Sequence, residues 1–293
     1  MNIFFIGTVE FSRKMLIKLI ALNAQICGVA TMKTSHYNSD FTDLTDICQQ
    51  NKIPYKYILD INDSEVIEWI GYLEADIIFC FGWSRLLKKQ LLNCVTMGVL
   101  GCHPAFLPLN RGRHPLIWAL ALGLEQTAST FFFMDEGADS GEILSQHIVT
   151  INYDDNASLL YKKIVSTSEK QIEEFLPLLS NNNYKTVKQD EKLSNKWRKR
   201  SKIDGEIDWR MTSRAIYNLV RSLSSPYPGA HLIYKGEEYK VWDVKEHNEI
   251  LPNIEPGKVI EVCENKFKVK VYGGVIEVIK HELSIIPKID EYL

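Results

Sequence analysis

The first 31 residues read "MNIFFIGTVEFSRKMLIKLIALNAQICGVAT" (1–31): a short apolar run, a longer amphipathic stretch and a second apolar run. The runs "NIFFI" (2–6) and "ICGVAT" (26–31) are continuously hydrophobic, which is typical of parallel strands buried on both faces. Between Glu10 and Leu22 the apolar residues recur at helical spacing. The stretch therefore predicts a strand, a helix and a second strand, the repeating unit of a parallel α/β sheet.

The same alternation continues to about residue 180. Further apolar runs predict strands at 76–81, 97–102, 129–135 and 142–151. Helical patterns lie near 44–50, 65–73 and 86–92, and a long one covers 157–179. We expect a Rossmann-like, mostly parallel sheet covered by helices.

A polar stretch rich in Asn, Lys and Ser, "SNNNYKTVKQDEKLSNKWRKR" (180–200), interrupts this pattern. It predicts a domain boundary, with a catalytic domain over 1–182, a linker over 183–205 and a C-terminal domain over 206–293. After it come one helical pattern, 212–223, and several turn-separated β runs. The C-terminal part therefore predicts a smaller, mostly antiparallel β domain.

The composition limits the classes of partner. The 293 residues carry a net charge of -3 and a pI near 6.2, so no global field favours DNA or tRNA. The six cysteines form no CxxC pair, which indicates a reducing cytosol and no metal site. No targeting segment and no apolar run of about 18 residues is visible, so we expect a cytoplasmic protein without a membrane partner.

In an open parallel sheet, ligands bind beyond the carboxyl ends of the strands, and three strand-end loops carry polar residues. The loop "GTVEF" (7–11) has one glycine where a dinucleotide site would have three, so it fits a simple turn with Thr8 as helix cap. In "GCHPAFLPLNRGRHP" (101–115), His103 is either an acid or base or an ordinary buried histidine. The cations Arg111, Arg113 and His114 suit an anionic substrate or a solvated surface loop.

The third loop, "MDEGADSGEIL" (134–144), crowds Asp135, Glu136 and Asp139 around two glycines. Like charges this close raise one another's pKa, and the glycines permit tight turns that present backbone amides. An acidic turn between two strands would look the same. Each loop alone therefore leaves its role open.

The three loops together resemble the formyltransferase family that uses 10-formyltetrahydrofolate. His103 and Asp139, framed by "LPLNRGRHP" and "MDEGADSGEIL", match its active-site loops. The likeness covers nearly the whole chain, from "FFIGTVEFSRKMLIKL" to the C-terminal domain. There, "NLVRSLSSPYPGA" (218–230) is similar to the sugar N-formyltransferases of surface-polysaccharide pathways, such as O-antigen and lipopolysaccharide biosynthesis.

The resemblance implies an active site built from an Asn-x-His pair and an aspartate. Its histidine falls on His103 and its aspartate on Asp139, but Gly101 stands at the position of the asparagine. Glycine has no side-chain donor for the oxyanion, and loss of one such donor costs about a hundredfold or more in rate. A backbone amide, a water molecule or His114 could replace it, so we expect an active transferase.

The resemblance also implies the binding residues. Folate would lie across two loops, against Phe81, Gly82, Trp83, Leu86, Met134, Asp135, Glu136 and Gly137. For the acceptor, a nucleotide-linked amino sugar, we expect contacts from Gly7, Thr8, Phe11, Arg111, Arg113, Tyr217, Asn218, Arg221 and Tyr227. On the C-terminal helix, Tyr217, Asn218 and Arg221 form either a solvated face or a wall of this pocket. Trp83 could instead be ordinary core, and Tyr227 could simply pack.

Three other functions stay open. A methionyl-tRNA formyltransferase would grip a polyanion, yet the loop "MKTSHYNSDFTD" (32–43) is short and hardly basic. A hydrolase could release formate from formyltetrahydrofolate, with space for water at Gly101. A non-catalytic folate or nucleotide-sugar binder would show no turnover. The resemblance further implies a homodimer formed through the C-terminal domain.

Overall fold

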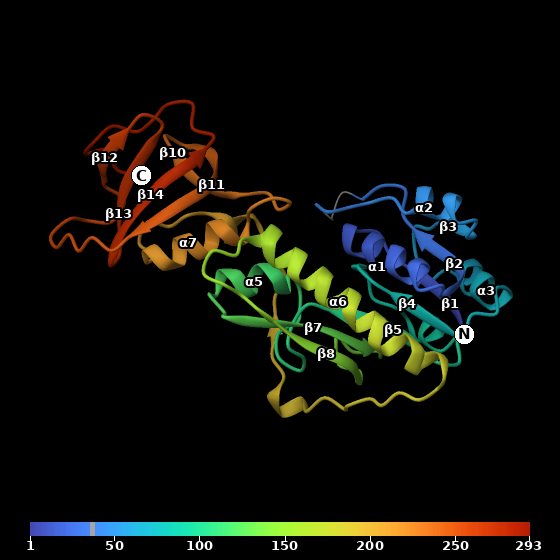
Figure 1. Cartoon of the computed structure of the whole chain (residues 1–293). Helices are drawn as coiled ribbons and strands as arrows, with labels where there is room; N and C mark the ends of the chain where they lie inside the picture. Colours follow the sequence, from blue (N-terminus) through green and yellow to red (C-terminus); the bar gives the residue numbers. More distant parts are fainter. Residues whose placement is uncertain (36–38) are drawn as a thin grey trace. The chain divides into compact units, whose positions relative to one another are not determined.

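A computed structural model describes residues 1–35 and 39–293, so part of the loop 32–43 lies outside the described residues. The chain forms two compact units, coloured along the sequence in Figure 1. The first unit comprises Met1–Pro115, Thr127–Val149 and Lys162–Trp197, and the second comprises Leu116–Gln126, Thr150–Tyr161 and Arg198–Leu293. The predicted linker 183–205 therefore contributes to both units.

The sheet of the first unit has seven strands in the order β3-β2-β1-β4-β5-β7-β8. The strands are β1 (Asn2–Ile6), β2 (Gln25–Thr31), β3 (Tyr55–Tyr57), β4 (Ile77–Cys80), β5 (Val99–His103), β7 (Gln126–Phe133) and β8 (Ile143–Thr150). The first five pair in parallel, and β7 runs antiparallel to β5. The expected mostly parallel sheet is confirmed, and it places the carboxyl ends of β1, β4 and β5 at one edge.

Helices cover this sheet because it is apolar on both faces. They are α1 (Glu10–Ala21), α2 (Thr45–Gln50), α3 (Ser64–Tyr72), α4 (Lys89–Leu92) and α6 (Ala157–Ser180). Met15 of α1 and Phe175 of α6 belong to the core on one face, and Ile70 of α3 and Leu91 of α4 to the core on the other.

The prediction of a helix over 86–92 was too long, because α4 begins only at Lys89. The side chain of Asn62 accepts a hydrogen bond from the backbone N–H of Lys88 at 2.6 Å and keeps that residue extended. Leu86 is exposed and adds no helical core contact.

The second unit contains a five-stranded sheet in the order β10-β11-β14-β13-β12, whose paired strands are all antiparallel. Its elements are α5 (Pro115–Ala121), α7 (Ser213–Ser222), β10 (Ala230–Tyr234), β11 (Glu237–His247), β12 (Val259–Cys263), β13 (Lys266–Val271) and β14 (Gly274–His281). The first residue of α5, Pro115, belongs to the first unit. Ile216, Leu219 and Val220 of α7 pack into the core of this unit. The predicted antiparallel C-terminal domain is confirmed.

Candidate active site

His103 and Asp139 come together although they lie far apart in the sequence. His103 is the last residue of β5 and is 6% exposed. Its Nε2 lies 2.9 Å from the carbonyl oxygen of Asn110, which can only accept, so Nε2 carries a proton and donates it. Its Nδ1 lies 3.7 Å from Asp139 Oδ1, beyond hydrogen-bond distance. Nδ1 is therefore the ring nitrogen that is free to act on a ligand.

The carboxylate of Asp139 is held by the opposite loop. Its Oδ2 accepts a hydrogen bond of 2.8 Å from the backbone N–H of Gly112, which leaves Oδ1 facing the imidazole. Asp139 has φ of 57° and Gly112 has φ of 103°, both in the left-handed region. A side chain at Gly112 would also collide with the carbonyl of Trp197. The backbone conformation at Gly112 and Asp139 thus orients the carboxylate of Asp139 toward His103.

The loop that follows His103 is tied down by side chains from the neighbouring strands. Thr130 of β7 donates to the carbonyl of Ala105 at 2.7 Å. Gln146 of β8 donates to the carbonyl of Leu107 at 2.9 Å and to Thr130 Oγ1 at 3.0 Å. These bonds satisfy buried carbonyl groups and restrict the loop that positions His103.

Gly101 lies in β5 two residues before His103, and the side chain of Met134 covers it. A Cβ built at Gly101 would lie 2.9 Å from Met134 Cγ, 3.1 Å from Met134 Sδ and 3.3 Å from Phe132 Cε1. The thioether therefore fills the space in which an asparagine side chain would begin. Next to it, desolvation raises the pKa of the Cys102 thiol to about 12, so this cysteine is a poor nucleophile.

The prediction that Arg111 contacts an anionic substrate needs correction. Its side chain is 2% exposed and donates to Gln189 Oε1 at 2.7 and 3.1 Å, and to Glu191 at 2.8 and 2.9 Å. The hydrogen bonds to Glu191 raise the pKa of Arg111. Arg111 is thus a buried structural cation. Arg113 is exposed and is the arginine of this turn that solvent reaches.

Among the residues expected to bind folate, Phe81 is placed in the core instead. Its ring is fully buried among Phe5, Phe79 and Phe131, at centroid distances of 5.3 to 5.7 Å. Phe81 follows β4 directly and continues its run of buried residues, so its side chain points into the core and the prediction that it binds folate was wrong. Gly82, with φ of 69°, turns the chain out of this core.

The loop "GTVEF" packs directly against that turn. Thr8 is buried and donates its hydroxyl to the carbonyl of Gly82 at 3.1 Å, so this hydroxyl is already paired. The helix cap is Val9, and the hydroxyl of Ser12 accepts from the N–H groups of Thr8 and Val9. Thr8 as a helix cap was therefore wrong. Gly7 has no space for a Cβ beside Ser12, and Phe11 is half-buried with its ring 6.4 Å from that of Phe81.

The other residues expected to bind folate keep surfaces that a ligand could use. The indole Nε1 of Trp83 is buried and has no hydrogen-bond partner among residues 1–35 and 39–293. Leu86 is exposed and Met134 is half-buried. Asp135, Glu136 and Gly137 are exposed: Asp135 Oδ1 accepts from the N–H of Gly137 at 2.9 Å, and Glu136 lies 3.3 Å from Lys89.

In the second unit, two residues expected to face the acceptor are buried. Arg221 donates to the carbonyls of Asn152, Tyr153 and Asp155 at 3.0 to 3.1 Å and to Asn218 Oδ1 at 2.9 Å. Both Arg221 and Asn218 are buried, so they hold a turn and form neither a solvated face nor an open wall.

The two tyrosines expected at the acceptor also pack. Tyr217 stacks on Tyr153 with ring centroids 4.9 Å apart and an interplanar angle of 8°. Tyr227 is half-buried and packs against the core of the second unit.

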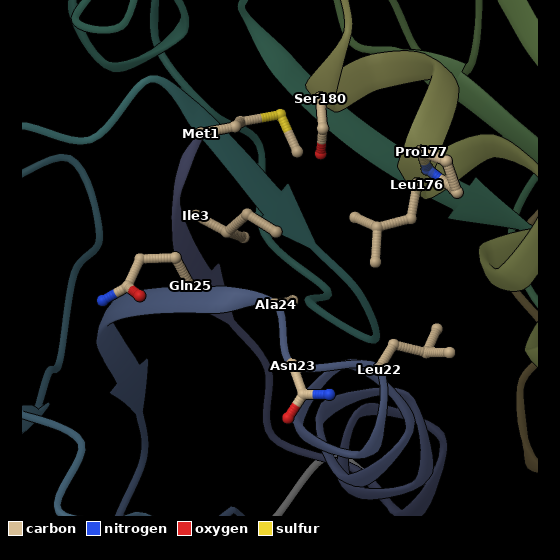
Figure 2. Close-up of a pocket in the computed structure, with 9 residues that line it drawn as sticks. All are labelled: Met1, Ile3, Leu22, Asn23, Ala24, Gln25, Leu176, Pro177 and Ser180. Carbon is tan, nitrogen blue, oxygen red and sulfur yellow. The ribbon is translucent and has the colours of Figure 1, made fainter.

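A hollow of about 290 Å³ lies elsewhere in the first unit, and Figure 2 draws the residues that line it. It is lined by Met1, Ile3, Leu22, Asn23, Ala24, Gln25, Leu176, Pro177 and Ser180. These residues lie near the amino ends of β1 and β2, at the edge of the sheet opposite His103. The hollow has no acidic, basic or histidine side chain in its lining.

The described residues contain neither a metal-binding cluster nor a membrane-spanning helix. No cluster of histidine, cysteine and acidic side chains in residues 1–35 and 39–293 could hold a metal ion. Within the same residues, none of the helices has the length and apolar character needed to cross a bilayer.

Comparison with known families matches both parts of the chain. A family model described as formyl transferase matches residues 1–176, and one described as formyl transferase, C-terminal domain, matches residues 199–288. The bifunctional polymyxin resistance protein ArnA of Wigglesworthia glossinidia brevipalpis is 31% identical over 229 residues. That match covers 78% of this chain and 35% of the relative, so the chain spans about a third of that protein's length.

Solved structures share the fold at low identity. WlaRD, a sugar 3N-formyl transferase solved with dTDP and 5-N-formyl-THF, has a TM-score of 0.72 at 19% identity, covering 95% of this chain and 96% of its own. An N-formyltransferase from Helicobacter canadensis, in complex with folinic acid and dTDP-3-aminofucose, has a TM-score of 0.73 at 18% identity, covering 96% and 99%. HypX from Aquifex aeolicus with tetrahydrofolic acid has a TM-score of 0.68 at 16% identity, covering 94% and 43%.

Proposed function

The chain belongs to the formyl transferase family, and we propose that it transfers the formyl group of 10-formyltetrahydrofolate to the amino group of a nucleotide-linked sugar. The observation that carries the proposal is the pair formed by the buried His103 and the partly exposed Asp139, whose Nδ1 and Oδ1 lie 3.7 Å apart with neither atom bonded to the other. A sugar acceptor is supported by two similar structures: WlaRD, a sugar 3N-formyl transferase, and the Helicobacter canadensis N-formyltransferase, which was solved with dTDP-3-aminofucose.

In this reaction the neutral amine attacks the formyl carbon, the carbonyl oxygen becomes an oxyanion, and the bond to N10 of the folate then breaks. His103 Nδ1, when protonated, donates to the developing oxyanion, while the carboxylate of Asp139 stabilises the imidazolium. The proton released by the amine passes to Asp139 or to water and finally to the leaving nitrogen. Nε2 takes no part, because it donates to the carbonyl of Asn110.

The residues near this pair fit a folate donor. The Nε1 of Trp83 is a buried hydrogen-bond donor without an acceptor in the described part of the chain, which is costly unless a ligand supplies one. Met134 and Leu86 offer apolar surface for a flat ring, and Gly137 leaves backbone groups exposed. Phe81, Thr8 and Arg111 drop out of the binding set because their side chains are already engaged.

One assay separates the proposed transferase from its alternatives. Tetrahydrofolate formation is followed with 10-formyltetrahydrofolate alone and then with nucleotide-linked 3- and 4-amino sugars. We expect turnover only with an amino sugar, together with the N-formyl product by mass spectrometry. Equal turnover without a sugar would identify a hydrolase, turnover with methionyl-tRNA alone would identify the tRNA enzyme, and binding without turnover would identify a carrier.

Three finer features belong to the same proposal: a homodimer, a place in surface-polysaccharide biosynthesis and a cytoplasmic location. The resemblance to sugar N-formyltransferases supports all three. Light scattering on the purified protein tests the dimer directly, since a monomer at micromolar concentration would contradict it.

Changing Gly101 to Asn, the residue at this position in the family, should lower the transfer rate here. The new Cβ would meet Met134 at 2.9 Å, and overfilling a packed site costs about 1 to 3 kcal/mol. We expect kcat/KM for the amino sugar to fall by about tenfold, which corresponds to an increase of about 1.4 kcal/mol in the activation free energy. Steady-state kinetics and the Tm of the variant measure the two effects.

The double variant Gly101→Asn with Met134→Ala provides the control. It removes the side chain that occupies the space, so its kcat should exceed that of Gly101→Asn alone when the formyl donor is at a saturating concentration, which offsets the loss of the folate contact at Met134. A faster Gly101→Asn single variant would show instead that Met134 moves aside readily and that the amide is a better donor.

A further inference from the structure

Gln189 lies in the polar stretch 183–205 that was predicted as a linker, yet its side chain is only 6% exposed. Its Nε2 donates to two backbone carbonyl oxygens of the Asp139 loop, that of Asp139 at 2.9 Å and that of Gly141 at 2.7 Å. We propose that Gln189 is a positioning residue that fixes the Asp139 loop and thereby aims its carboxylate at His103. The proposal rests on the proposed function, because the orientation of the Asp139 carboxylate affects the reaction rate only if His103 and Asp139 catalyse formyl transfer.

The orientation of the Gln189 amide is determined by Arg111. A guanidinium can only donate, and Arg111 places Nε and Nη2 at 3.1 and 2.7 Å from one oxygen, Oε1. The NH₂ group must therefore point the other way, toward the Asp139 loop. Glu191, whose side chain is exposed, accepts from Nη1 and Nη2 of the same guanidinium at 2.9 and 2.8 Å. These bonds fix the guanidinium on its solvent side.

The hydrogen bonds among Arg111, Gln189 and Glu191 connect the loop that follows His103 with the Asp139 loop. Arg111 is the neighbour of Asn110, whose carbonyl accepts from His103, and of Gly112, whose N–H donates to Asp139. Gln189 joins Arg111 to the backbone of Asp139, which has a left-handed φ of 57° and would relax without such support. A shift of about 1 Å at a reacting group can cost about a hundredfold in rate.

Gln189→Glu is the sharpest test, because a carboxylate has nearly the same shape. It keeps an acceptor for Arg111 but presents a negative oxygen, in place of a donor, to the carbonyls of Asp139 and Gly141. We expect kcat to fall by about tenfold to a hundredfold, with the KM for the amino sugar unchanged. Gln50→Glu makes the same chemical change at an exposed position of α2 and should leave kcat unchanged.

A second measurement does not depend on activity. The amide proton of Gly112 is bonded to Asp139 Oδ2, so its NMR resonance reports where the carboxylate lies. We expect this resonance to shift in Gln189→Glu and to stay in place in Gln50→Glu. If Gln189→Glu does not fold, Arg111→Lys, which cannot bind Oε1 through two nitrogens, should show the same shift.

The outcomes separate the two proposals. A normal kcat in Gln189→Glu, a rise in KM at constant kcat, or an unshifted Gly112 resonance would overturn the positioning role. A wild-type protein that forms no N-formyl product would overturn the proposed function, and the Gly112 resonance would then decide the role of Gln189 by itself.

Discussion

Replacing His103 by alanine is expected to lower formyl transfer by about a thousandfold, the combined scale of a lost oxyanion donor and a lost acid-base group. The reason lies in the ring's two nitrogens. Nε2 is committed to the carbonyl of Asn110, and Nδ1 is free beside Asp139 Oδ1 at 3.7 Å. Alanine keeps the backbone of β5 and removes the group that meets the reacting atoms, together with the hydrogen bond to the carbonyl of Asn110.

The measurement is the single-turnover rate with saturating donor and amino sugar, since this isolates the chemical step from product release. His147→Ala provides a matched control, because His147 of β8 is partly exposed and pairs with Glu174 at 3.1 Å. The control should react at the wild-type rate. A His103→Ala variant that transfers formyl groups at a near-normal rate would remove His103 from the mechanism.

Most of the strands and helices and the two-part architecture could be predicted because they depend on hydrophobic periodicity, which is local. The short strand β3 and the helix α5 were missed. Where prediction failed, the deciding partner was distant in sequence. The side chain of Asn62 keeps Lys88 extended, so that α4 begins only after it, and the two residues are 26 positions apart. Short pairs such as β6 (Arg111–Gly112) with β9 (Lys196–Trp197) leave no periodic signal at all.

The site shows the same limit in its charged residues. An arginine in a loop looks the same in sequence whether it faces solvent or a buried acceptor. Arg111 finds Gln189 and Glu191, nearly eighty residues away, and Arg221 finds three backbone carbonyls that no side-chain pattern encodes. Gln189 was missed for the same reason, since its neighbours in sequence are polar and exposed. The resemblance, in contrast, paired His103 with Asp139.

Gly101 is a case in which the structure answers a question that the sequence only raised. The missing side chain leaves little free space, because Met134 Cγ lies 2.9 Å and Met134 Sδ 3.1 Å from the position that a Cβ would take. Thioether sulfur is a weak acceptor and donates no proton. If the chain is an active transferase, a second oxyanion donor must therefore be a backbone N–H, a water molecule or another side chain, and His103 has a larger share of the work.

That larger share makes the charge of Asp139 the second decisive test. In Asp139→Asn the side chain keeps an oxygen to accept from the N–H of Gly112, so the loop should stay in place. An amide no longer stabilises an imidazolium, and it cannot take a proton from the amine. We expect the transfer rate to fall by about a hundredfold to ten-thousandfold, while the affinity for the nucleotide stays unchanged.

Single-turnover kinetics and nucleotide titration measure these two quantities separately. Asp63→Asn is the matched control, because Asp63 is exposed at the start of α3 and its side chain makes no capping hydrogen bond. A near-normal rate in Asp139→Asn would mean that neither the charge nor the proton acceptor is needed, and His103 would then act without a carboxylate partner.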